Sequence, residues 1–466
     1  MAQPHHFHPT ILREYDVRGI VGETLFAADA RALGRAFATQ LAAEGRGLRI
    51  VVGYDGRLSS PELTAALVDG LEESGAEVLS IGRGPTPMNY FAVHHLDADG
   101  GIHVTGSHNP PSHNGFKMMI GKASFFGERI QKLRPIAEAG AFRDGPRGHV
   151  REVPVFDAYV ERLAADFHGL RPIKAVWDTG NGAAGPACEA LTARLPGSHE
   201  VLFADIDGHF PNHHPDPTEP HNLEALIARV QATGAEIGIG FDGDGDRIGV
   251  VDGQGRILWG DQLIQILASD VLPRYPGATI IADVKASKTL FDAIAEMGGK
   301  PLMWKTGHSL IKAKMAELGA PLSGEMSGHI FYNDGFYGHD DALYVAVRLL
   351  DVLARGERTA ADWRDAMPDV VNTPEIRIDC PDERKFDVIR EVKERLAARG
   401  ADVVAVDGVR VNTPEGWWLM RASNTQAVVV ARAEAADEAG LEHLKATIRR
   451  ELDHAGVASP ASLQRR

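Results

Sequence analysis

The segment LRIVVGYDGR, residues 48–57, predicts a buried strand that ends in a polar turn, and the same pattern returns twice along the chain. IKAVWDTGN begins at residue 173 and ATIIADVKAS at residue 278, and a helical segment follows each strand. In the first unit, Ser59 and Glu62 have the spacing of a capping box at the start of that helix. Strands that alternate with helices imply largely parallel sheets. We therefore predict three related α/β domains with mixed, largely parallel sheets.

The last strand of each unit leads into an unusual loop. These loops are TGSHNP at 105–110, DGDGDR at 242–247 and GEMSGH at 324–329, here named the serine, aspartate and glutamate loops. Open α/β sheets bind ligands beyond the carboxyl ends of their strands. Because the three loops occupy the same place in three related units, we expect them to converge on one cleft.

The chain from residue 368 onward predicts a smaller α+β domain with an antiparallel sheet. Its segment RASNTQA, residues 421–427, connects two predicted strands and is here named the arginine loop. The predicted domains are 1–152, 153–254, 255–367 and 368–466.

The composition argues against several classes of protein. The formal net charge of -15 over 466 residues disfavours a broad nucleic-acid or anionic-membrane surface. The two cysteines, Cys188 and Cys380, lack the spacing of a metal or redox pair, which fits a reducing compartment. The N-terminus lacks the apolar core of a signal peptide, and no apolar run is long enough to span a bilayer. We expect a cytoplasmic protein with no nucleic-acid or membrane partner.

The aspartate loop places Asp242, Asp244 and Asp246 at alternating positions with glycine between them. Three carboxylates this close repel one another unless a hard cation neutralises them, and a set of oxygen ligands suits Mg²⁺. The loop is not an EF-hand, because Arg247 stands where that motif has its invariant glycine and Gly253 where it has its glutamate. The sequence therefore predicts a magnesium site.

The serine loop carries Ser107, which fits neither of two familiar patterns. A lipase-like elbow needs G-x-S-x-G, but Thr105 and Asn109 occupy the glycine positions. No P-loop is present in the sequence. A serine beside a magnesium loop could instead carry a phosphoryl group, with Lys117 and Arg247 stabilising the group in transfer.

The remaining loops offer groups suited to a phosphosugar. Glu325 and Ser327 of the glutamate loop could bind vicinal sugar hydroxyls. The arginine loop offers a fork-shaped cation and small donors suited to a phosphate dianion, namely Arg421, Ser423, Asn424 and Thr425. His308 and His329 are candidate general bases.

Two functions of other classes are also compatible with parts of the sequence. Gly180, Gly182 and Gly185 follow a strand and precede a helix, with Asp205 about twenty residues on, as in a dinucleotide-binding oxidoreductase. The other two units lack this pattern, which weakens that hypothesis. A non-catalytic phosphosugar-binding protein would need the arginine loop but not Ser107.

The four loops together resemble the α-D-phosphohexomutase family, nearest to its bacterial phosphomannomutase/phosphoglucomutase branch. The similarity runs from REYDVRG at 13–19 to RASNT at 421–425. It implies a heart-shaped molecule of four domains around a central cleft, in which Ser107 is the phosphoserine and Asp242, Asp244 and Asp246 hold Mg²⁺ with its phosphate. It further implies that the sugar, its phosphate and the reacting groups are contacted by Tyr15, Arg18, Lys117, Arg247, Lys285, His308, Glu325, Ser327, His329, Arg421, Ser423, Asn424 and Thr425.

The resemblance also implies a reaction. Phosphoserine would exchange its phosphoryl group with C1 or C6 of mannose or glucose phosphates through a hexose 1,6-bisphosphate, which also serves as activator, with Lys117 and His329 as acid/base candidates. Phosphoglucosamine mutase is the alternative, disfavoured because that branch usually has glutamine at the position of Met326 and alanine at that of Gly106. A monomer or weak homodimer that supplies nucleotide-sugar and polysaccharide precursors is expected.

Overall fold

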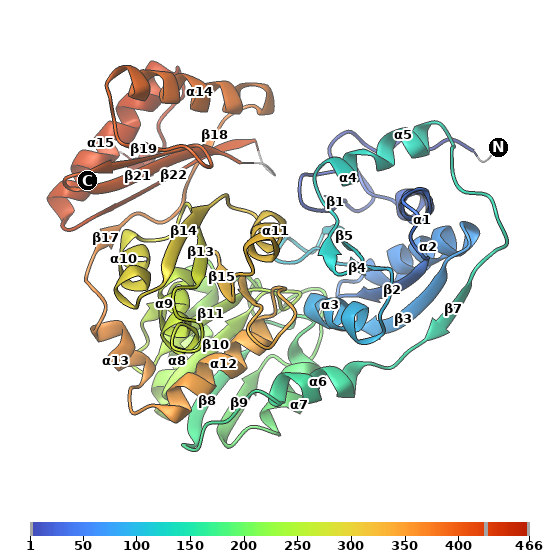
Figure 1. Ribbon diagram of the computed structural model, residues 1–466, viewed down its shortest axis with the longest axis horizontal. Coiled ribbons are helices and arrows are strands. Elements are labelled where there is room, and N and C mark those ends of the chain that lie inside the picture. Colours follow the sequence, from blue (N-terminus) through green and yellow to red (C-terminus); the bar gives the residue numbers. More distant parts are fainter. Residues whose placement is uncertain (1–2, 424–426, 464–466) are drawn as a thin grey trace.

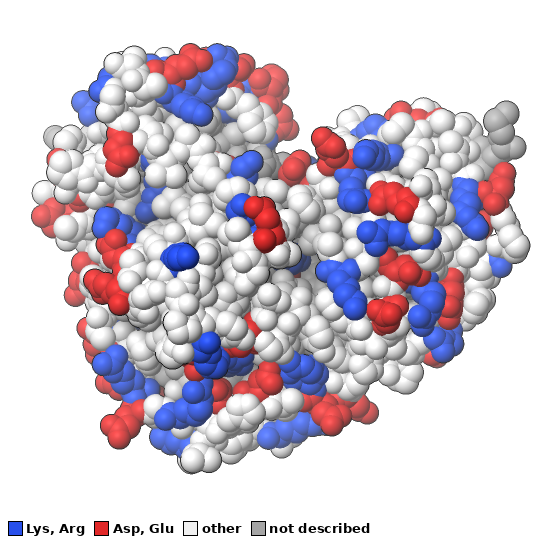
Figure 2. All heavy atoms as spheres, in the orientation of Figure 1, with Lys and Arg blue, Asp and Glu red and all other residues white. Residues whose placement is uncertain are grey.

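The computed structural model describes residues 3–423 and 427–463, which form four domains arranged around a central hollow. The N-terminal domain lies on one side and the C-terminal domain on the other, above a base formed by the two middle domains (Figure 1). The space-filling view shows the surface hollowed between these two outer domains (Figure 2). This arrangement confirms the predicted four-domain fold.

The first domain is built on a seven-stranded sheet in the order β1-β5-β4-β2-β3-β7, with β6 paired to β5. Its strands are β1 (Val17–Ile20), β2 (Arg49–Tyr54), β3 (Glu77–Arg83), β4 (Gly100–Val104), β5 (His113–Ile120), β6 (Ala123–Ser124) and β7 (His149–Glu152). Its helices are α1 (Ala27–Ala43), α2 (Ser60–Glu73), α3 (Thr86–His95), α4 (Glu128–Gln131) and α5 (Leu133–Glu138).

The second domain has a five-stranded sheet in the order β12-β11-β10-β8-β9. Its strands are β8 (Ile173–Asp178), β9 (Gly197–Leu202), β10 (Ile237–Phe241), β11 (Ile248–Asp252) and β12 (Ile257–Leu258). Its helical elements are α6 (Phe156–Ala164), α7 (Gly185–Thr192), the short 3-10 helix η1 (Pro220–Leu223) and α8 (Glu224–Thr233).

The third domain has a four-stranded sheet in the order β14-β13-β15-β16. Its strands are β13 (Thr279–Asp283), β14 (Lys300–Trp304), β15 (Leu322–Gly324) and β16 (Ile330–Tyr332). Its helices are α9 (Gly260–Val271), α10 (Lys288–Glu296), α11 (His308–Leu318), α12 (Ala342–Arg355) and α13 (Ala360–Asp365).

The three sheets share one strand order, which confirms the repeat read from the sequence. The orders β5-β4-β2-β3, β11-β10-β8-β9 and β16-β15-β13-β14 are equivalent. In each unit three strands run parallel and a fourth returns antiparallel to the last of them. The serine, aspartate and glutamate loops are the connections into those returning strands. Each loop therefore lies at the carboxyl end of the corresponding parallel strand, where ligands bind to such sheets.

The C-terminal domain has a fully antiparallel sheet in the order β17-β22-β21-β20-β19, with β18 paired to β22. Its strands are β17 (Val371–Asn372), β18 (Ile376–Asp379), β19 (Val403–Val404), β20 (Val409–Thr413), β21 (Gly416–Ala422) and β22 (Val428–Ala435). Its helical elements are α14 (Asp382–Ala398), α15 (Glu438–His454) and the 3-10 helix η2 (Ala461–Leu463). The arginine loop connects β21 to β22.

The clusters of buried apolar side chains show which domains share a common core. One cluster of buried side chains runs from Val51 and Tyr90 of the first domain through Trp177 of the second to Ile264 of the third. The C-terminal domain has a core of its own between its sheet and the helices α14 and α15. The two middle domains and part of the first therefore share one continuous apolar core.

The C-terminal sheet packs on the third domain through an apolar cluster of Val284, Trp417 and Leu419 and through charged contacts. Arg410 lies over the ring of Trp417, with 3.6 Å from its Cζ to the ring centroid. The same guanidinium donates to the carbonyl oxygens of Val284 and Ala286, at 2.7 and 2.6 Å. Arg410 of β20, stacked on Trp417 of β21, thereby attaches the C-terminal sheet to the loop that follows β13.

One local prediction is wrong. Ser59 precedes α2, but its side chain makes no capping bond to the helix backbone. Its Oγ instead accepts a hydrogen bond from Asn114 Nδ2 at 2.9 Å. The tertiary contact with β5 has taken the place of the local cap, while Pro61 occupies the first turn as its fixed φ favours.

The domain boundaries stay predictions.

Two further observations concern the whole described chain. Cys188 and Cys380 are buried, free thiols. Among the residues described, none of the helices combines the length and the apolar character needed to cross a membrane.

Candidate active site

Two buried residues that follow β2, Asp55 and Arg57, fix the position of the serine loop. Asp55 accepts hydrogen bonds from the Thr105 hydroxyl at 2.8 Å and from the Gly106 amide at 3.1 Å. The Arg57 guanidinium donates to four backbone carbonyls of the loop region, those of Ser107, Asn109, Pro110 and His113, at 2.6 to 2.9 Å. Asp55 and Arg57 also pair with each other at 3.2 Å. The loop is therefore fixed along most of its length.

Ser107 has a strained and specific position in this loop. Its φ of 50° lies in the left-handed region, which a residue with a side chain adopts only when its surroundings impose it. Only 2% of its surface is exposed. Its Oγ donates to Asp242 Oδ2 at 2.8 Å. The serine hydroxyl thus points directly at the aspartate loop.

Gly243 explains how the two loops approach so closely. A Cβ at this position would lie 2.5 Å from the Ser107 carbonyl oxygen. A side chain of any size would therefore push the aspartate loop away from Ser107.

The three aspartates form a completely buried cluster. The carboxylate oxygens that Asp242, Asp244 and Asp246 offer lie within 4.8 Å of one another. Lys117 from β5 donates to Asp244 at 2.8 Å and also contacts Asp246. Asp244 Oδ1 and Asp246 Oδ1 are buried without a hydrogen-bond partner among the described residues. These oxygens are arranged to receive a cation.

The electrostatics of the cluster lead to the same conclusion. Burial, reinforced by Asp244, raises the pKa of Asp242 well above its ordinary value, and the same two causes raise the pKa of Asp246. Burial also acts against ionisation of Asp244, but Lys117 outweighs it and holds that pKa well below the ordinary value. Lys117 is buried too, yet the acidic cluster raises its pKa. One ammonium group does not neutralise three carboxylates, so a divalent cation would relieve the remaining repulsion.

Arg247, at the end of the aspartate loop, reaches into the third domain. Its Nε donates to His329 Nε2 at 2.9 Å. The other ring nitrogen, His329 Nδ1, lies 3.0 Å from Asp340 Oδ2. His308, at the first position of α11, stacks on His329 with the ring centroids 5.4 Å apart. Burial, with Lys312, lowers the pKa of His308 well below its ordinary value.

The glutamate loop lies beside the N-terminus of α11. Glu325 is buried, and its Oε1 accepts a hydrogen bond from the Gly307 amide at 2.7 Å. Burial raises the pKa of this carboxyl group, and His329 opposes the shift. Tyr15 donates to the Thr306 carbonyl at 2.9 Å, so the first domain contacts the same segment. Ser327, two residues after Glu325, is partly exposed.

Carboxylates pair with three cationic residues predicted to contact the substrate, namely Lys285, Arg421 and Arg18. Lys285 donates to Glu375 at 3.1 Å, and Arg421 Nε donates to Asp407 at 2.8 Å. In both cases the partner carboxylate outweighs burial and raises the pKa of the cation. Arg18 donates to Asp16 at 2.5 Å.

Ser423 is buried, and its amide donates to the Val428 carbonyl at 3.0 Å. Asn424 and Thr425, also predicted to bind phosphate, lie outside the described residues. The structure therefore brings the serine, aspartate and glutamate loops together and places the described start of the arginine loop at their edge.

Four family models match the chain in the same order as its four sheets. They are the phosphoglucomutase/phosphomannomutase alpha/beta/alpha domains I, II and III, over residues 9–144, 157–255 and 259–370, and the C-terminal domain over 375–451.

The chain belongs to the phosphoglucomutase/phosphomannomutase family.

Individual members of this family are similar over nearly the whole length. A phosphomannomutase/phosphoglucomutase of Pseudomonas aeruginosa is 44% identical over 443 residues, which cover 95% of each chain. A phosphoglucomutase of Neisseria gonorrhoeae is 43% identical over 93% of this chain and 95% of its own. The crystal structure of a family protein from Burkholderia thailandensis superimposes with a TM-score of 0.90 at 46% identity, covering 96% of this chain and 98% of that one. The chain is accordingly an isomerase, a mutase of phosphohexoses.

Sequence reasoning missed a second set of residues, which lie at the carboxyl ends of the parallel strands. The parallel strands β2, β8 and β13 each lead into or end in an aspartate, namely Asp55, Asp178 and Asp283. Asp55 holds the serine loop, and Asp283 accepts a hydrogen bond from the Met326 amide of the glutamate loop at 3.1 Å. The aligned aspartates of GYDGR, VWDTG and IADVK were the available signal. Asp340, Asp407 and Thr86 gave no comparable signal, because only the fold brings them to the site.

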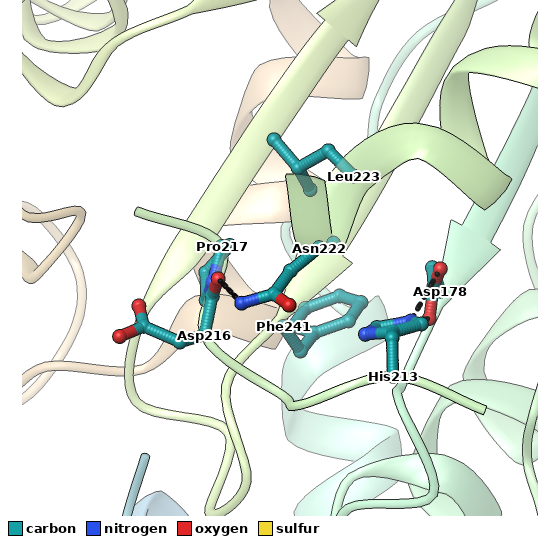
Figure 3. Close-up of a pocket in the computed structure, with 8 residues that line it drawn as sticks. Asp178, His213, Asp216, Pro217, Asn222, Leu223 and Phe241 are labelled. Atoms are coloured by element: carbon teal, nitrogen blue, oxygen red, sulfur yellow. Dashed lines mark hydrogen bonds and ion pairs between the residues drawn. The ribbon is translucent and has the colours of Figure 1, made fainter. Parts of the chain in front are cut away.

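The glycine pattern of the second domain has a structural explanation without a dinucleotide. A Cβ on Gly182 would lie 2.9 Å from the Gly243 carbonyl, and one on Gly185 would lie 1.9 Å from the Ala204 carbonyl. Asp178 contacts His213 through both carboxylate oxygens at 3.0 Å (Figure 3). Gly182 therefore lets this turn pack against the aspartate loop, and Gly185 lets it pack against the segment after β9.

Proposed function

We propose that this mutase moves a phosphoryl group reversibly between C1 and C6 of mannose and glucose phosphates, with Ser107 as phosphoserine and a hexose 1,6-bisphosphate as intermediate. The names of the Pseudomonas and Neisseria relatives support these two sugars. Phosphoglucosamine mutase is the alternative. A cytoplasmic location, and a monomeric or weakly dimeric state, stay predictions.

The observation that carries this proposal is the position of Ser107. The four hydrogen bonds from Arg57 to loop carbonyls, here called the Arg57 clamp, hold the Ser107 backbone in a left-handed conformation. The buried Ser107 hydroxyl points at Asp242. A serine held only as a turn residue would not need a buried arginine with four carbonyl contacts. This geometry suits a group that must take up and release a phosphoryl group in one fixed place.

The acidic cluster fits a magnesium ion. Asp242, Asp244 and Asp246 would hold it together with one oxygen of the phosphate on Ser107, because oxygen ligands suit Mg²⁺ and two of these carboxylate oxygens have no hydrogen-bond partner among the described residues. When bound, the ion would neutralise negative charge on the transferring phosphoryl group.

Lys117 and Arg247 would stabilise the same group from its other sides. Asp244 and Asp246 outweigh burial and keep Lys117 protonated, and Asp216 with Asp242 does the same for Arg247. Lys117 is the first acid/base candidate, because it carries a proton beside the acidic cluster. His329 is the second acid/base candidate, because its ring lies between Arg247 and Asp340.

The sugar would bind between the glutamate and arginine loops. Glu325 has one carboxylate oxygen bonded to the Gly307 amide, and we infer that the other receives sugar hydroxyls together with Ser327. Arg421, Ser423, Lys285 and Tyr15 would hold the phosphate that is not reacting, with Asn424 and Thr425 predicted to join them. The hexose 1,6-bisphosphate must turn around in this site, so these contacts must accept both of its orientations.

A direct comparison of substrates tests the proposal. We expect similar kcat/KM values for mannose 1-phosphate and glucose 1-phosphate with Mg²⁺ and a trace of hexose 1,6-bisphosphate, and loss of turnover on chelation. A preference above about a hundredfold for glucosamine 1-phosphate, some 2.7 kcal/mol, would favour the alternative. Ser107→Ala should abolish turnover, and retained activity would contradict the phosphoserine.

A further inference from the structure

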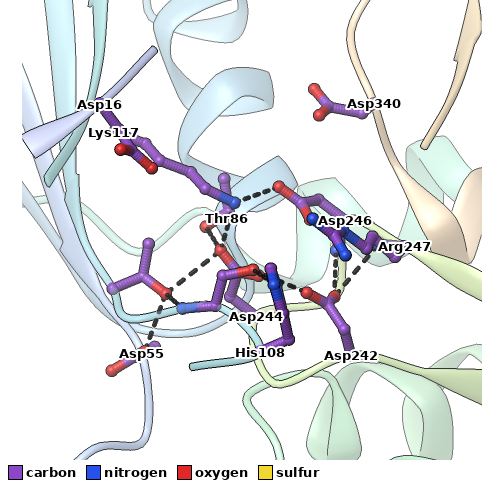
Figure 4. A network of polar contacts seen from close by, with 12 residues as sticks. Asp16, Asp55, Thr86, His108, Lys117, Asp242, Asp244, Asp246, Arg247 and Asp340 are labelled. Carbon is purple, nitrogen blue, oxygen red and sulfur yellow. Dashed lines mark hydrogen bonds and ion pairs between the residues drawn. The ribbon is translucent and has the colours of Figure 1, made fainter. Parts of the chain in front are cut away.

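We propose that Asp340 is a positioning residue that fixes the tautomer of His329, and that Lys312 fixes the orientation of Asp340. This inference rests on the proposed function only in assigning acid/base work to His329. Asp340 follows the glutamate loop by several residues and enters the site from the segment before α12. In Figure 4 it lies beyond Asp246, with no dashed line to the other residues drawn.

The tautomer follows from the contact with Arg247. A guanidinium carries only donors and stays protonated in proteins. Because Arg247 Nε donates to His329 Nε2 at 2.9 Å, this ring nitrogen must offer its lone pair. In a neutral imidazole the proton then belongs on Nδ1. That nitrogen lies 3.0 Å from Asp340 Oδ2 and 3.6 Å from Asp246 Oδ1.

Asp340 offers the nearest acceptor for this proton: His329 Nδ1 and Asp340 Oδ2 lie 3.0 Å apart, and neither atom has a hydrogen-bond partner among the described residues. Asp340 is completely buried and is the nearer of the two acids to His329 Nδ1. Asp246 is shared with Lys117 and belongs to the three-aspartate cluster assigned to the metal, while one ligand atom each of Asp246, His329 and Asp340 also lie within 4.8 Å of one another. The same Asp340 Oδ2 lies 3.7 Å from His308 Nδ1, so it faces both stacked histidines.

Lys312 determines which oxygen faces the histidines. Its Nζ donates to Asp340 Oδ1 at 2.8 Å and lies 4.5 Å from the centroid of the Tyr90 ring. Although burial acts in the opposite direction, Lys312 holds the pKa of Asp340 well below its ordinary value. The lysine comes from α11, one turn after His308. One oxygen of Asp340 is thus bound to a cation while the other remains for His329.

This arrangement predicts an unusual response to Asp340→Asn. Lys312 has only donors, so it must bind the amide oxygen of the new side chain. The amide NH2 group would then face His329 Nδ1, which must become the acceptor. The proton would move to Nε2, where it would oppose the N–H of Arg247. A wrong tautomer of this kind is severe in a catalytic triad whose aspartate is changed to asparagine.

Lys312→Met gives the matched test, because it removes the donor that fixes the asparagine. Without Lys312, the amide can turn its oxygen toward His329 Nδ1 and restore the original tautomer. We expect Asp340→Asn to lower kcat by about a hundredfold or more while KM changes less than about threefold. The double variant Asp340→Asn/Lys312→Met should have a kcat at least about tenfold higher than that of Asp340→Asn.

The tautomer itself can be read without activity. In protein labelled with ¹⁵N-histidine, the long-range ¹H–¹⁵N couplings of His329, assigned through His329→Gln, should show Nδ1 protonated in the wild type and Nε2 protonated in Asp340→Asn. Nε2 protonated in the wild type would overturn the proposal even if neither Asp340 variant folds. So would a double variant no faster than Asp340→Asn. A wild type with the expected tautomer but no mutase turnover would refute the proposed function and leave the positioning role intact.

Discussion

Arg57 offers the most direct perturbation of the serine loop that leaves Ser107 in place. In Arg57→Ala, four loop carbonyls lose a charged donor at once, and buried Asp55 loses its ion-pair partner. Hydrogen bonds to charged groups contribute about 1.5–3 kcal/mol each, but four that share one guanidinium are not additive. Breaking a buried pair typically costs about 3–5 kcal/mol. We therefore expect the free energy of unfolding to fall by about 4 kcal/mol.

The same change should slow phosphoryl uptake by Ser107. Its left-handed conformation stores about 1–3 kcal/mol of strain that the clamp now imposes. A released loop would relax, and returning Ser107 to its reactive position would cost that amount in each reaction. This corresponds to a rate reduced by between about 5-fold and 150-fold. The assay is the rate at which hexose 1,6-bisphosphate phosphorylates Ser107 in a rapid-quench experiment.

Arg348→Ala is the matched control. Arg348 is also buried and bonds to Asp334 at 2.9 Å and Asp270 at 3.1 Å, so its loss should destabilise the protein comparably. None of its partners belongs to the serine loop, and phosphorylation of Ser107 should therefore remain near the wild-type rate. The reasoning is refuted if folded Arg57→Ala accepts phosphate as fast as this control.

Three further outcomes are expected. Gly106→Ala should lower the rate of Ser107 phosphorylation by at least about tenfold, because a Cβ there would lie 2.4 Å from the Arg57 guanidinium; a rate within twofold of the wild type would show that the clamp yields easily. Lys285 lowers the pKa of Glu375 to about 2 against the opposing effect of burial, so this pair stabilises the protein above the unfolded pKa of 4.5 and loses its effect as the pH falls toward 2. In urea unfolding, this pair should therefore contribute about 0.8 kcal/mol less to the free energy of unfolding at pH 4 than at pH 7. The variant Glu375→Gln should lack this part of the pH dependence. Asp242→Asn should weaken Mg²⁺ binding in calorimetry by about tenfold or more, and unchanged affinity would mean that the ion binds elsewhere.

The sequence predicted the parts of this molecule that depend on local pattern. Alternating strands and helices gave the repeat, and the composition of the serine, aspartate and glutamate loops singled them out for the site. Their convergence followed from one general property of parallel sheets. The prediction of a capping box at Ser59 was wrong, because the Ser59 hydroxyl accepts a tertiary hydrogen bond from Asn114 instead of bonding to the helix backbone.

The residues that hold the loops could not be predicted in the same way. Arg57 stands in an ordinary strand-to-helix turn, and nothing in that turn shows that its guanidinium will reach carbonyls some fifty residues later. Asp340 and Lys312 are 28 residues apart, and each has an unremarkable local sequence. Their function depends on contacts between segments that are far apart in the sequence but meet within one folded domain, and residue composition does not contain this information.

The central claim, that Ser107 carries the phosphoryl group, can be tested by mass spectrometry of the protein itself. Incubation with Mg²⁺ and glucose 1,6-bisphosphate should add one phosphoryl group, located on Ser107 by peptide fragmentation, and excess glucose 1-phosphate should remove it as glucose 1,6-bisphosphate. The aspartate cluster predicts that chelation prevents both steps. A protein that interconverts hexose phosphates at full rate with Ser107 unmodified throughout, or with the phosphate on another residue, would contradict the account.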